Sequence, residues 1–339
     1  MKTLKIATIG LGRVGLSRHV EIPFKHPHFK VIACTDTNIK RLSEVKEKYN
    51  VNIYTDYKAM IDKEDIDLVV IASPTNFHFE QTAYAFSKGK NVFLEKPMTP
   101  NLSQAKKLVS IAQKYNKKIM LHQQHRTFPT TSALLDGLSK NLIGNIYRVN
   151  YNISGFTARN DWQAQKKYGG GMLYNYGAHF IDVFLYVFNV SFKSVYCKMN
   201  KILSVGDAED VVKIILETKE DITYDLDINM ASNIKHNKWI IYGDKGSIII
   251  TDDNMIIKYI KDKKPLSLKL QTTLMAENRK YDNTGILEWI EEIIPISAYK
   301  NIQYYDKVYE FFALNKKPIV PIEESIKVME ILDKCSYNV

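Results

Sequence analysis

A glycine-rich turn near the N-terminus constrains the fold of this chain more than any other feature. Residues 5–9 are mostly apolar and predict a short buried strand, and Gly10-Leu11-Gly12-Arg13-Val14-Gly15 follows at once, ahead of a helical pattern. Gly10 permits a tight turn, Gly12 lets a pyrophosphate approach the backbone, and Gly15 lets the helix pack closely on the strand. A second strand, at 31–35, ends on Asp36, about 20 residues after Gly15. This order of elements predicts a unit that binds a dinucleotide.

The residue at the end of the second strand also indicates which dinucleotide. The Asp36 carboxylate can accept hydrogen bonds from ribose hydroxyls and repels a 2′-phosphate, which favours NAD over NADP. Lys40 and Arg41 lie close enough in sequence to keep NADP possible. We expect NAD, and from this unit we expect cofactor contacts by Gly10, Gly12, Arg13, Val14, Gly15, Asp36, Thr37 and Arg41.

Strand and helix patterns alternate over residues 1–122. Such alternation is typical of a doubly wound parallel sheet, so we predict an α/β Rossmann domain over 1–122. Further strands are expected at 67–72, 91–94 and 118–121, and helices at 38–49, 78–87 and 101–115.

The pattern changes near residue 145. One helical stretch, 172–188, precedes β-branched and aromatic runs that turn signals separate, which indicates a large, mostly antiparallel sheet open on one face. We therefore predict an α+β domain over 123–339, whose helices at 302–314 and 322–333 pack back on the domain junction. The expected strands are 192–199, 211–217, 222–228, 239–242, 247–250 and 255–260.

Composition excludes several classes of protein. A membrane-spanning helix needs about 20 apolar residues, and no apolar run approaches this length. We therefore expect that the protein does not bind a membrane. The first residues enter a core strand directly and the three cysteines lack metal spacing, which predicts a cytoplasmic protein. The net charge of +10 weakly favours an anionic partner, but the lysines are scattered apart from a patch at Lys258, Lys261, Lys263 and Lys264. We expect this patch to be solvated, with no nucleic-acid partner.

Two polar segments follow predicted parallel strands, at the sheet edge where such folds bind ligands. In the first, Ser73-Pro74-Thr75-Asn76-Phe77-His78, the expected cofactor contacts are Ser73, Pro74, Asn76 and His78, although His78 also suits the start of the next helix. The second, Glu95-Lys96-Pro97, places a cation in the crevice that faces the nicotinamide, next to Glu95.

A third segment combines glycines, a histidine and an acid. Gly169-Gly170-Gly171 lead into a predicted helix on which Asn175 and His179 are four residues apart and share a face, with Asp182 three residues later. Asn175 can hold a substrate hydroxyl, and His179 can exchange its proton. We therefore expect a substrate site here, with Tyr176 and Asp182 as further contacts.

In their order along the chain, these motifs resemble those of the glucose-fructose oxidoreductase / inositol dehydrogenase / MocA (Gfo/Idh/MocA) oxidoreductases. The resemblance implies that Lys96 and His179 form the catalytic pair. The residue four before the histidine contacts substrate and is often Asp in the family, whereas here it is Asn175. From the segments at 122–126 and 159–162, the resemblance also implies that Gln124, Arg126, Arg159 and Trp162 line the nicotinamide and substrate side of the cleft, with Arg126 assigned to substrate.

The expected reaction is hydride transfer between a nicotinamide and a secondary alcohol of a sugar, polyol or sugar derivative, free, phosphorylated or nucleotide-linked. An alcohol is a poor acid, so a base must accept its proton, and an imidazole that titrates near neutral pH suits this task. We expect His179 to be the base and Lys96 to stabilise the developing alkoxide. Two alternatives stay open: an NAD-dependent glycoside hydrolase that oxidises its sugar transiently, and a non-catalytic regulator that senses NAD or sugar.

The sequence also bears on assembly and on metal binding. An open antiparallel sheet face tends to be covered by another subunit, so we expect a homo-oligomer, a dimer or a tetramer. His122 and His125 have the spacing of a metal pair, as do His26 and His28, but no carboxylate or cysteine lies near them in sequence. We therefore expect no metal.

Overall fold

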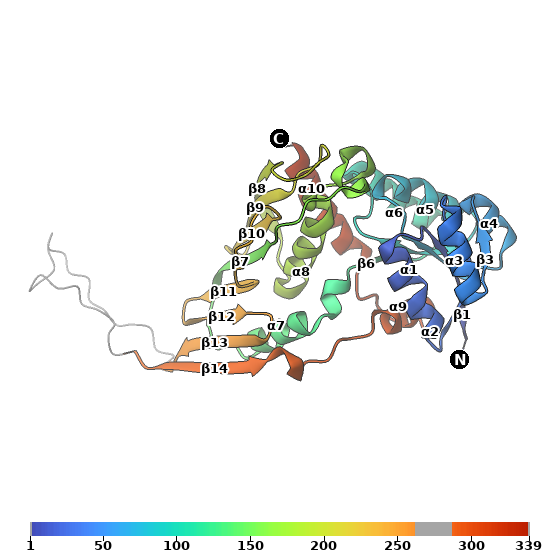
Figure 1. Cartoon of the computed structure of the whole chain (residues 1–339). Coiled ribbons are helices and arrows are strands. Elements are labelled where there is room, and N and C mark those ends of the chain that lie inside the picture. The colour runs from blue at the N-terminus through green and yellow to red at the C-terminus, as the bar shows by residue number, and fades with distance from the viewer. Residues whose placement is uncertain (1, 262–286, 338–339) are drawn as a thin grey trace, which may run out of the picture.

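The computed structural model of the protein describes residues 2–261 and 287–337 (Figure 1). Two sheets organise these residues, one six-stranded and parallel, the other eight-stranded and mostly antiparallel. The predicted fold class is confirmed. Lys263 and Lys264 of the predicted basic patch lie outside the described residues.

The first sheet has the strand order β3-β2-β1-β4-β5-β6, and all of its pairs are parallel. Every residue of β4 is buried, because helices cover both faces of a parallel sheet. The order reverses between β1 and β4, which opens a ligand crevice at the carboxyl edge. The strands are β1 (Leu4–Ile9), β2 (Phe29–Thr35), β3 (Asn52–Tyr54), β4 (Leu68–Ile71), β5 (Asn91–Glu95) and β6 (Ile119–His122).

Helices connect these strands, and several begin at a side chain that caps them. Asn38 accepts hydrogen bonds from the amides of Lys40 and Arg41, and Asn101 accepts one from Gln104, which satisfies amides that lack a partner within the helix. The helices are α1 (Arg13–His19), α2 (Glu21–Lys25), α3 (Ile39–Tyr49), α4 (Tyr57–Lys63), α5 (His78–Ser87) and α6 (Leu102–Lys114).

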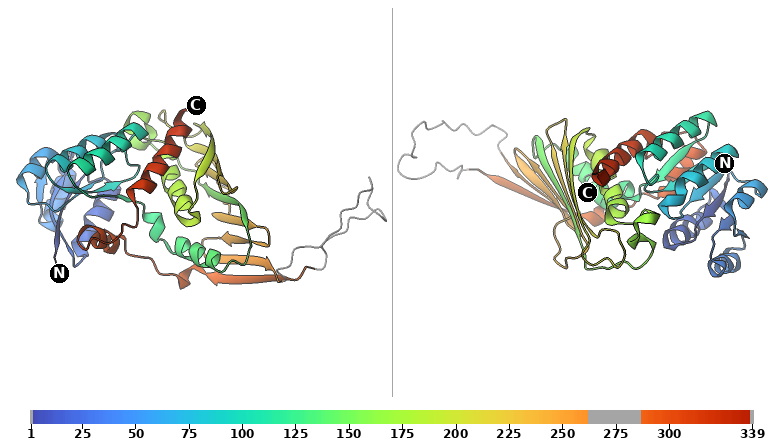
Figure 2. Two further views of the ribbon diagram at one scale, coloured as in Figure 1. Left: turned by 180° about the vertical axis from the view of Figure 1, so that it is seen from behind. Right: turned by 90° about the horizontal axis from the view of Figure 1, so that it is seen from above.

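The second sheet has the order β14-β13-β12-β11-β7-β10-β9-β8, with β7 and β10 as its parallel pair. Burial alternates along β10, as expected of a strand with one covered face. In Figures 1 and 2, α7 (Pro129–Ser139) and α8 (Ala178–Phe188) lie on the face turned toward the first sheet. The strands are β7 (Ile146–Ser154), β8 (Phe192–Asn200), β9 (Val211–Thr218), β10 (Thr223–Asn229), β11 (Trp239–Gly243), β12 (Gly246–Ile250), β13 (Asn254–Ile260) and β14 (Trp289–Pro295).

The two C-terminal helices return to the earlier part of the chain. On α9 (Tyr304–Phe312), the Tyr304 hydroxyl donates to the carbonyl of Leu121 in β6, so this helix completes the first sheet's core. The last helix, α10 (Ile322–Tyr337), packs against α8, α6 and β8 and thereby bridges both sheets.

Two features of the fold bear on partners. Among the described residues, no helix combines the length and apolarity needed to cross a bilayer. Large apolar side chains are exposed on β7, β8 and β14, namely Tyr147, Tyr196, Trp289 and Ile293. The homo-oligomer stays a prediction.

Candidate functional site

The glycine turn borders a cavity of about 790 Å³ at the carboxyl edge of the first sheet. Gly10 has a φ of +91°, and a Cβ there would lie 2.7 Å from the amide nitrogen of Ser73. A Cβ on Gly15 would lie 1.9 Å from the carbonyl oxygen of Gly10, so only glycine allows this approach of helix to strand. Among the described residues, no atom beyond Gly12 and its two chain neighbours lies within 4 Å of the Cβ position on Gly12, which leaves space for a ligand. The turn therefore fits the pyrophosphate of NAD.

Asp36 lies in the same cavity and is held in place by backbone amides. Its Oδ2 accepts a hydrogen bond from the amide of Leu11 at 2.7 Å, and its Oδ1 accepts one from the amide of Asn38 at 2.8 Å. The guanidinium of Arg41 lies 3.5 Å from Oδ2. The predicted cofactor residues that line this cavity are Gly10, Gly12, Arg13, Val14, Gly15, Asp36, Thr37, Arg41, Ser73, Pro74, Arg159 and Trp162.

A second cavity, of about 290 Å³, adjoins the first and contains the predicted catalytic pair. Lys96 and His179 both line it, and Arg13, Ser73 and Trp162 line both cavities. The other predicted residues in its lining are Val14, Glu95, Gln124, Arg159, Asn175 and Tyr176. A ligand that extends from the glycine turn therefore reaches the lysine and the histidine.

The Lys96 ammonium is positioned by Asn175, which lies about one helical turn before His179. Nζ donates to the Asn175 carbonyl oxygen at 2.6 Å and to Asn175 Oδ1 at 3.1 Å, which leaves one of its three donors for a ligand. Burial lowers the pKa of Lys96 to about 8; the charge of Glu95 opposes this effect, whereas those of Arg13 and Arg159 add to it. Lys96 thus loses its charge just above neutral pH.

His179 lies at the start of α8, directly after a π-helical turn, Leu173–Gly177, that replaces the first part of the predicted helix. The Gln123 amide donates through Nε2 to the carbonyl of Ala178 at 3.2 Å, so its Oε1 accepts from Nδ1 of His179 at 2.8 Å. This arrangement puts the imidazole proton on Nδ1 and leaves Nε2 with a free lone pair.

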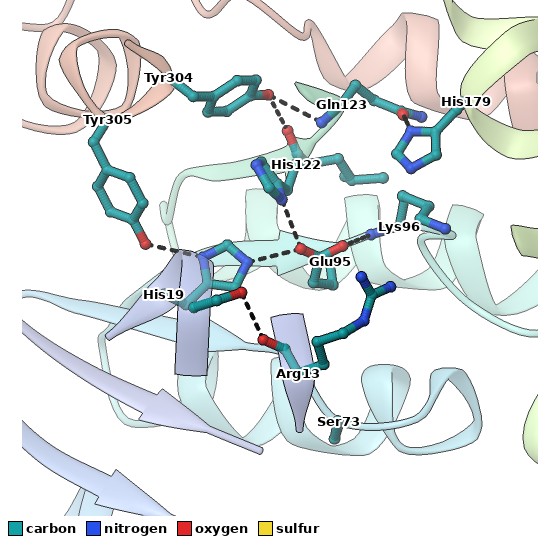
Figure 3. Close-up of polar contacts among 12 residues, drawn as sticks. Arg13, His19, Ser73, Glu95, Lys96, His122, Gln123, His179, Tyr304 and Tyr305 are labelled. Atoms are coloured by element: carbon teal, nitrogen blue, oxygen red, sulfur yellow. Dashed lines mark hydrogen bonds and ion pairs between the residues drawn. The ribbon is translucent and has the colours of Figure 1, made fainter. Parts of the chain in front are cut away.

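The electrostatic surroundings keep His179 neutral. Burial, reinforced by the positive charge of Lys96, holds the pKa of His179 well below its usual value of 6.5. The ring of His125 lies 4.5 Å away, and burial lowers its pKa to about 3. His179 is therefore a proton acceptor at neutral pH, and Figure 3 shows it beside Gln123 and Lys96.

Glu95 lies within a buried network of hydrogen bonds behind Lys96 (Figure 3). Its Oε1 accepts from Nε2 of His19 at 2.7 Å and from Nδ1 of His122 at 2.6 Å, and Nδ1 of His19 accepts from the Tyr305 hydroxyl at 2.9 Å. Although burial opposes ionisation, these two histidines hold the pKa of Glu95 well below its usual range. Oε2 accepts from the Lys96 amide at 3.2 Å, so Glu95 supports the backbone of the lysine.

The tertiary structure thus places a carboxylate beside His122, which the sequence spacing did not indicate. The ligand atoms of His19, Glu95 and His122 lie within 4.8 Å of one another. Glu95 accepts from both histidines and Tyr305 donates to His19, so these groups also satisfy one another by hydrogen bonds, and the absence of a metal stays a prediction.

Four predicted site residues line neither cavity. The Arg126 guanidinium forms a buried bidentate ion pair with Asp182, at 2.7 and 2.6 Å, and we correct their assignment from substrate binding to structure. His78 is buried, with its ring nitrogens 2.9 Å from the carbonyl oxygens of Pro97 and Ser73. Both ring nitrogens of His78 are thus satisfied by the backbone, and its assignment is corrected likewise. Asn76 lies in the turn before α5, and its Oδ1 is buried without a hydrogen-bond partner among the described residues, so its contact to the cofactor stays a prediction.

Other residues of the site were not predicted. Gln123, which orients His179, follows β6 at the ligand edge of the sheet, and this position was a usable signal. Spacing within the chain did not indicate the others, because they come from segments, among them the end of β6 and the π-helical turn, that meet only in the folded protein. The additional lining residues include His122, His125, Gln163, Gly169 and Tyr174.

Comparisons with known proteins agree with this architecture. Residues 4–123 match an oxidoreductase family with an NAD-binding Rossmann fold, and residues 133–249 match the GFO/IDH/MocA C-terminal domain. The oxidoreductase sll0816 of Synechocystis sp. is 25% identical over 271 residues, 74% of this chain and 72% of that protein. D-glucoside 3-dehydrogenase of Escherichia coli K12 is 28% identical over 188 residues, which are 54% of each protein.

A solved structure extends the similarity over the whole fold. The WlbA dehydrogenase of Chromobacterium violaceum, crystallised with NADH and UDP-GlcNAcA, has a TM-score of 0.81 and 19% identity to this chain. The match covers 100% of this chain and 94% of that one, so the two share the same arrangement of both sheets.

Proposed function

The chain belongs to the GFO/IDH/MocA oxidoreductase family, and on that premise we propose that it transfers a hydride between NAD and a secondary alcohol of a sugar, polyol or sugar derivative. One observation carries this proposal: Lys96 and His179 line a cavity that shares Arg13, Ser73 and Trp162 with the cavity at the glycine turn. The relatives add support for the substrate class, since one is named a glucoside dehydrogenase and another was crystallised with a nucleotide sugar.

The proposed mechanism assigns a separate task to each member of the pair. Bound NAD supplies the nicotinamide ring that takes up or returns the hydride. His179 Nε2 accepts the hydroxyl proton as the substrate is oxidised, and Gln123 keeps the other ring nitrogen protonated. The free donor of Lys96 stabilises negative charge on the substrate oxygen, while Asn175 holds the ammonium in place.

The activity is tested with a panel of polyols, sugars, sugar phosphates and nucleotide sugars, assayed by NADH absorbance with NAD and NADP separately. We expect net formation of NADH with at least one member, and faster reaction with NAD than with NADP. A cofactor that stays bound while a glycoside is cleaved without net NADH would instead indicate the hydrolase, and ligand binding without turnover would indicate the regulator.

The Asn175→Asp variant is expected to move the alkaline limit of activity. In the wild type, Lys96 is charged below pH about 8 and loses its charge above it, so kcat/KM should fall there. A carboxylate at residue 175 would favour the ammonium and raise the pKa of Lys96, shifting this limb upward by about one pH unit. The measurement is kcat/KM against pH, with the exposed Asn237→Asp as the matched control; an unchanged limb would contradict the role of Lys96.

The Gln123→Glu variant is expected to move the acidic limit instead. A carboxylate that accepts from Nδ1 stabilises the imidazolium, so the pKa of His179 rises and the variant loses its base at a higher pH than the wild type. We expect the acidic limb of the kcat/KM profile to shift to higher pH by about one unit or more, since an ionised partner within hydrogen-bond distance raises the pKa of a histidine by this amount. The exposed Gln113→Glu serves as control, and an acidic limb that stays in place would argue against His179 as the base.

A further inference from the structure

The cavity that holds the catalytic pair is unevenly charged. Arg13, Arg18, Lys96 and Arg159 all line it, and the carboxylate in its lining is Glu95. Glu95 also accepts hydrogen bonds from two buried histidines, and its single negative charge is outnumbered by the four cations. The cavity therefore offers an excess of cationic groups to its ligand.

Two of the three arginines in this lining, like Lys96, have no partner of opposite charge within the described ranges. The arginine ion pairs there involve Arg41, Arg126, Arg148 and Arg159, the last with Asp161. Arg13 and Arg18 are in none of them, and Figure 3 shows the Arg13 side chain directed toward Glu95 and Lys96. Gathering like charges around a cavity is unfavourable unless an anion binds among them.

The cofactor accounts for part of this charge. Arg13 and Arg159 line both cavities, so the pyrophosphate of NAD can neutralise them. Arg18 differs, because it lines the second cavity and not the first. It lies on α1 with an exposed side chain, next to the buried His19 of the Glu95 network. The charge of Arg18 is therefore available to the substrate rather than to the cofactor.

From this distribution we propose that the substrate carries a carboxylate or a phosphate group, and that Arg18 is a specificity-determining residue that contacts it. The inference rests on the proposed function, since it takes the second cavity as the substrate site. Three cations that line the cavity then have different tasks. Lys96 stabilises the reacting oxygen, Arg13 contacts the pyrophosphate of the cofactor, and Arg18 contacts the anionic group of the substrate.

The test is calorimetric binding to the NADH-bound protein at constant ionic strength. The probes are glucose, galactose and mannose, each with its uronate and its 6-phosphate, so that carboxylate and phosphate are compared on the same ring. We expect at least one anionic sugar to bind about tenfold more tightly than its neutral parent, which is the effect of one charge-assisted hydrogen bond. Uronates that bind more tightly than 6-phosphates would identify a carboxylate, and the reverse a phosphate.

The Arg18→Gln variant identifies the residue responsible. We expect it to remove most of the preference for the anionic sugar while the affinity for NADH stays within about twofold, and we expect the exposed Lys25→Gln of α2 to change neither. The inference is overturned if no anionic probe binds more tightly than its parent, or if Arg18→Gln weakens neutral and anionic sugars equally.

These outcomes are distinct from failure of the proposed function. Turnover of a neutral sugar that depends on Lys96 and His179, with no anionic preference, would keep the oxidoreductase and reject the role of Arg18. An anionic preference that requires Arg18, without NADH formation from any bound sugar, would keep the anion site and reject the proposed reaction.

Discussion

Replacing Lys96 with methionine is expected to lower kcat by ~100-fold or more, the contribution of a typical acid–base or charge-stabilising group. Methionine matches the length and apolar stem of lysine but donates no hydrogen bond to the developing alkoxide. The same loss is expected for His179→Gln, which keeps a polar side chain and removes the basic nitrogen. The measurement is initial-rate kinetics on a substrate found with the panel above.

Three controls separate a loss of chemistry from a loss of structure. The affinity for NAD, measured by calorimetry, should change little, because the contacts proposed for the cofactor lie mainly at the glycine turn and Asp36. Thermal unfolding should show that both variants are folded, and the exposed Lys107→Met of α6 should retain wild-type activity. A Lys96 or His179 variant with near wild-type turnover would refute the catalytic pair.

The double variant adds a sharper criterion. If Lys96 and His179 act on the same oxygen and proton, their effects should be strongly non-additive, since loss of one already disables the shared step. A double variant much slower than either single one would mean that the two residues support separate steps.

The largest effect on stability is expected from Asp182→Asn. Asp182 is fully buried and receives two hydrogen bonds from the guanidinium of Arg126, whose pKa the ion pair raises further. Removing the negative charge leaves a buried arginine short of its partner, which typically costs about 3–5 kcal/mol. We therefore expect a marked decrease in the free energy of unfolding, measured by urea denaturation.

A second carboxylate on the same guanidinium provides the control. Glu324 of α10 lies 2.6 Å from Arg126, but a third of its side chain is exposed, so solvent screens this pair. Glu324→Gln should lower stability by at most about 1 kcal/mol. Equal effects of the two variants would show that burial of Asp182 is not what makes its ion pair important.

The elements that could be predicted from the sequence differ in a physical way from those that could not. Features that depend on neighbours in sequence were predicted well: the glycine turn, the strand that ends on Asp36 and most of the strands of both sheets. Other elements, including β3, α4, α7, β7 and β14, were not predicted. The three residues of β3 carry too little pattern, and packing in the folded protein decides the structure of the longer ones.

The side chains of the site divide in a similar way. Lys96 follows the end of a strand and His179 lies at the start of a helix, and both positions can be recognised in the sequence. The topology brings these two positions to the same edge, so the two residues line one cavity. Arg126 and Asp182 carry equally polar groups, yet they bond to each other in the interior. Polarity alone does not distinguish a side chain that faces a ligand from one that is satisfied inside the protein.

Local order along the chain thus specified the class of fold and the cofactor turn, and it indicated Lys96 and His179 as the proposed catalytic pair. The folded arrangement alone decided the tautomer of His179, through Gln123, the support of Lys96 by Glu95 and Asn175, and the uneven charge of the second cavity. The reason is physical: secondary structure and turns arise from interactions over a few residues, whereas hydrogen-bond partners, burial and the resulting pKa values depend on groups far apart in the chain.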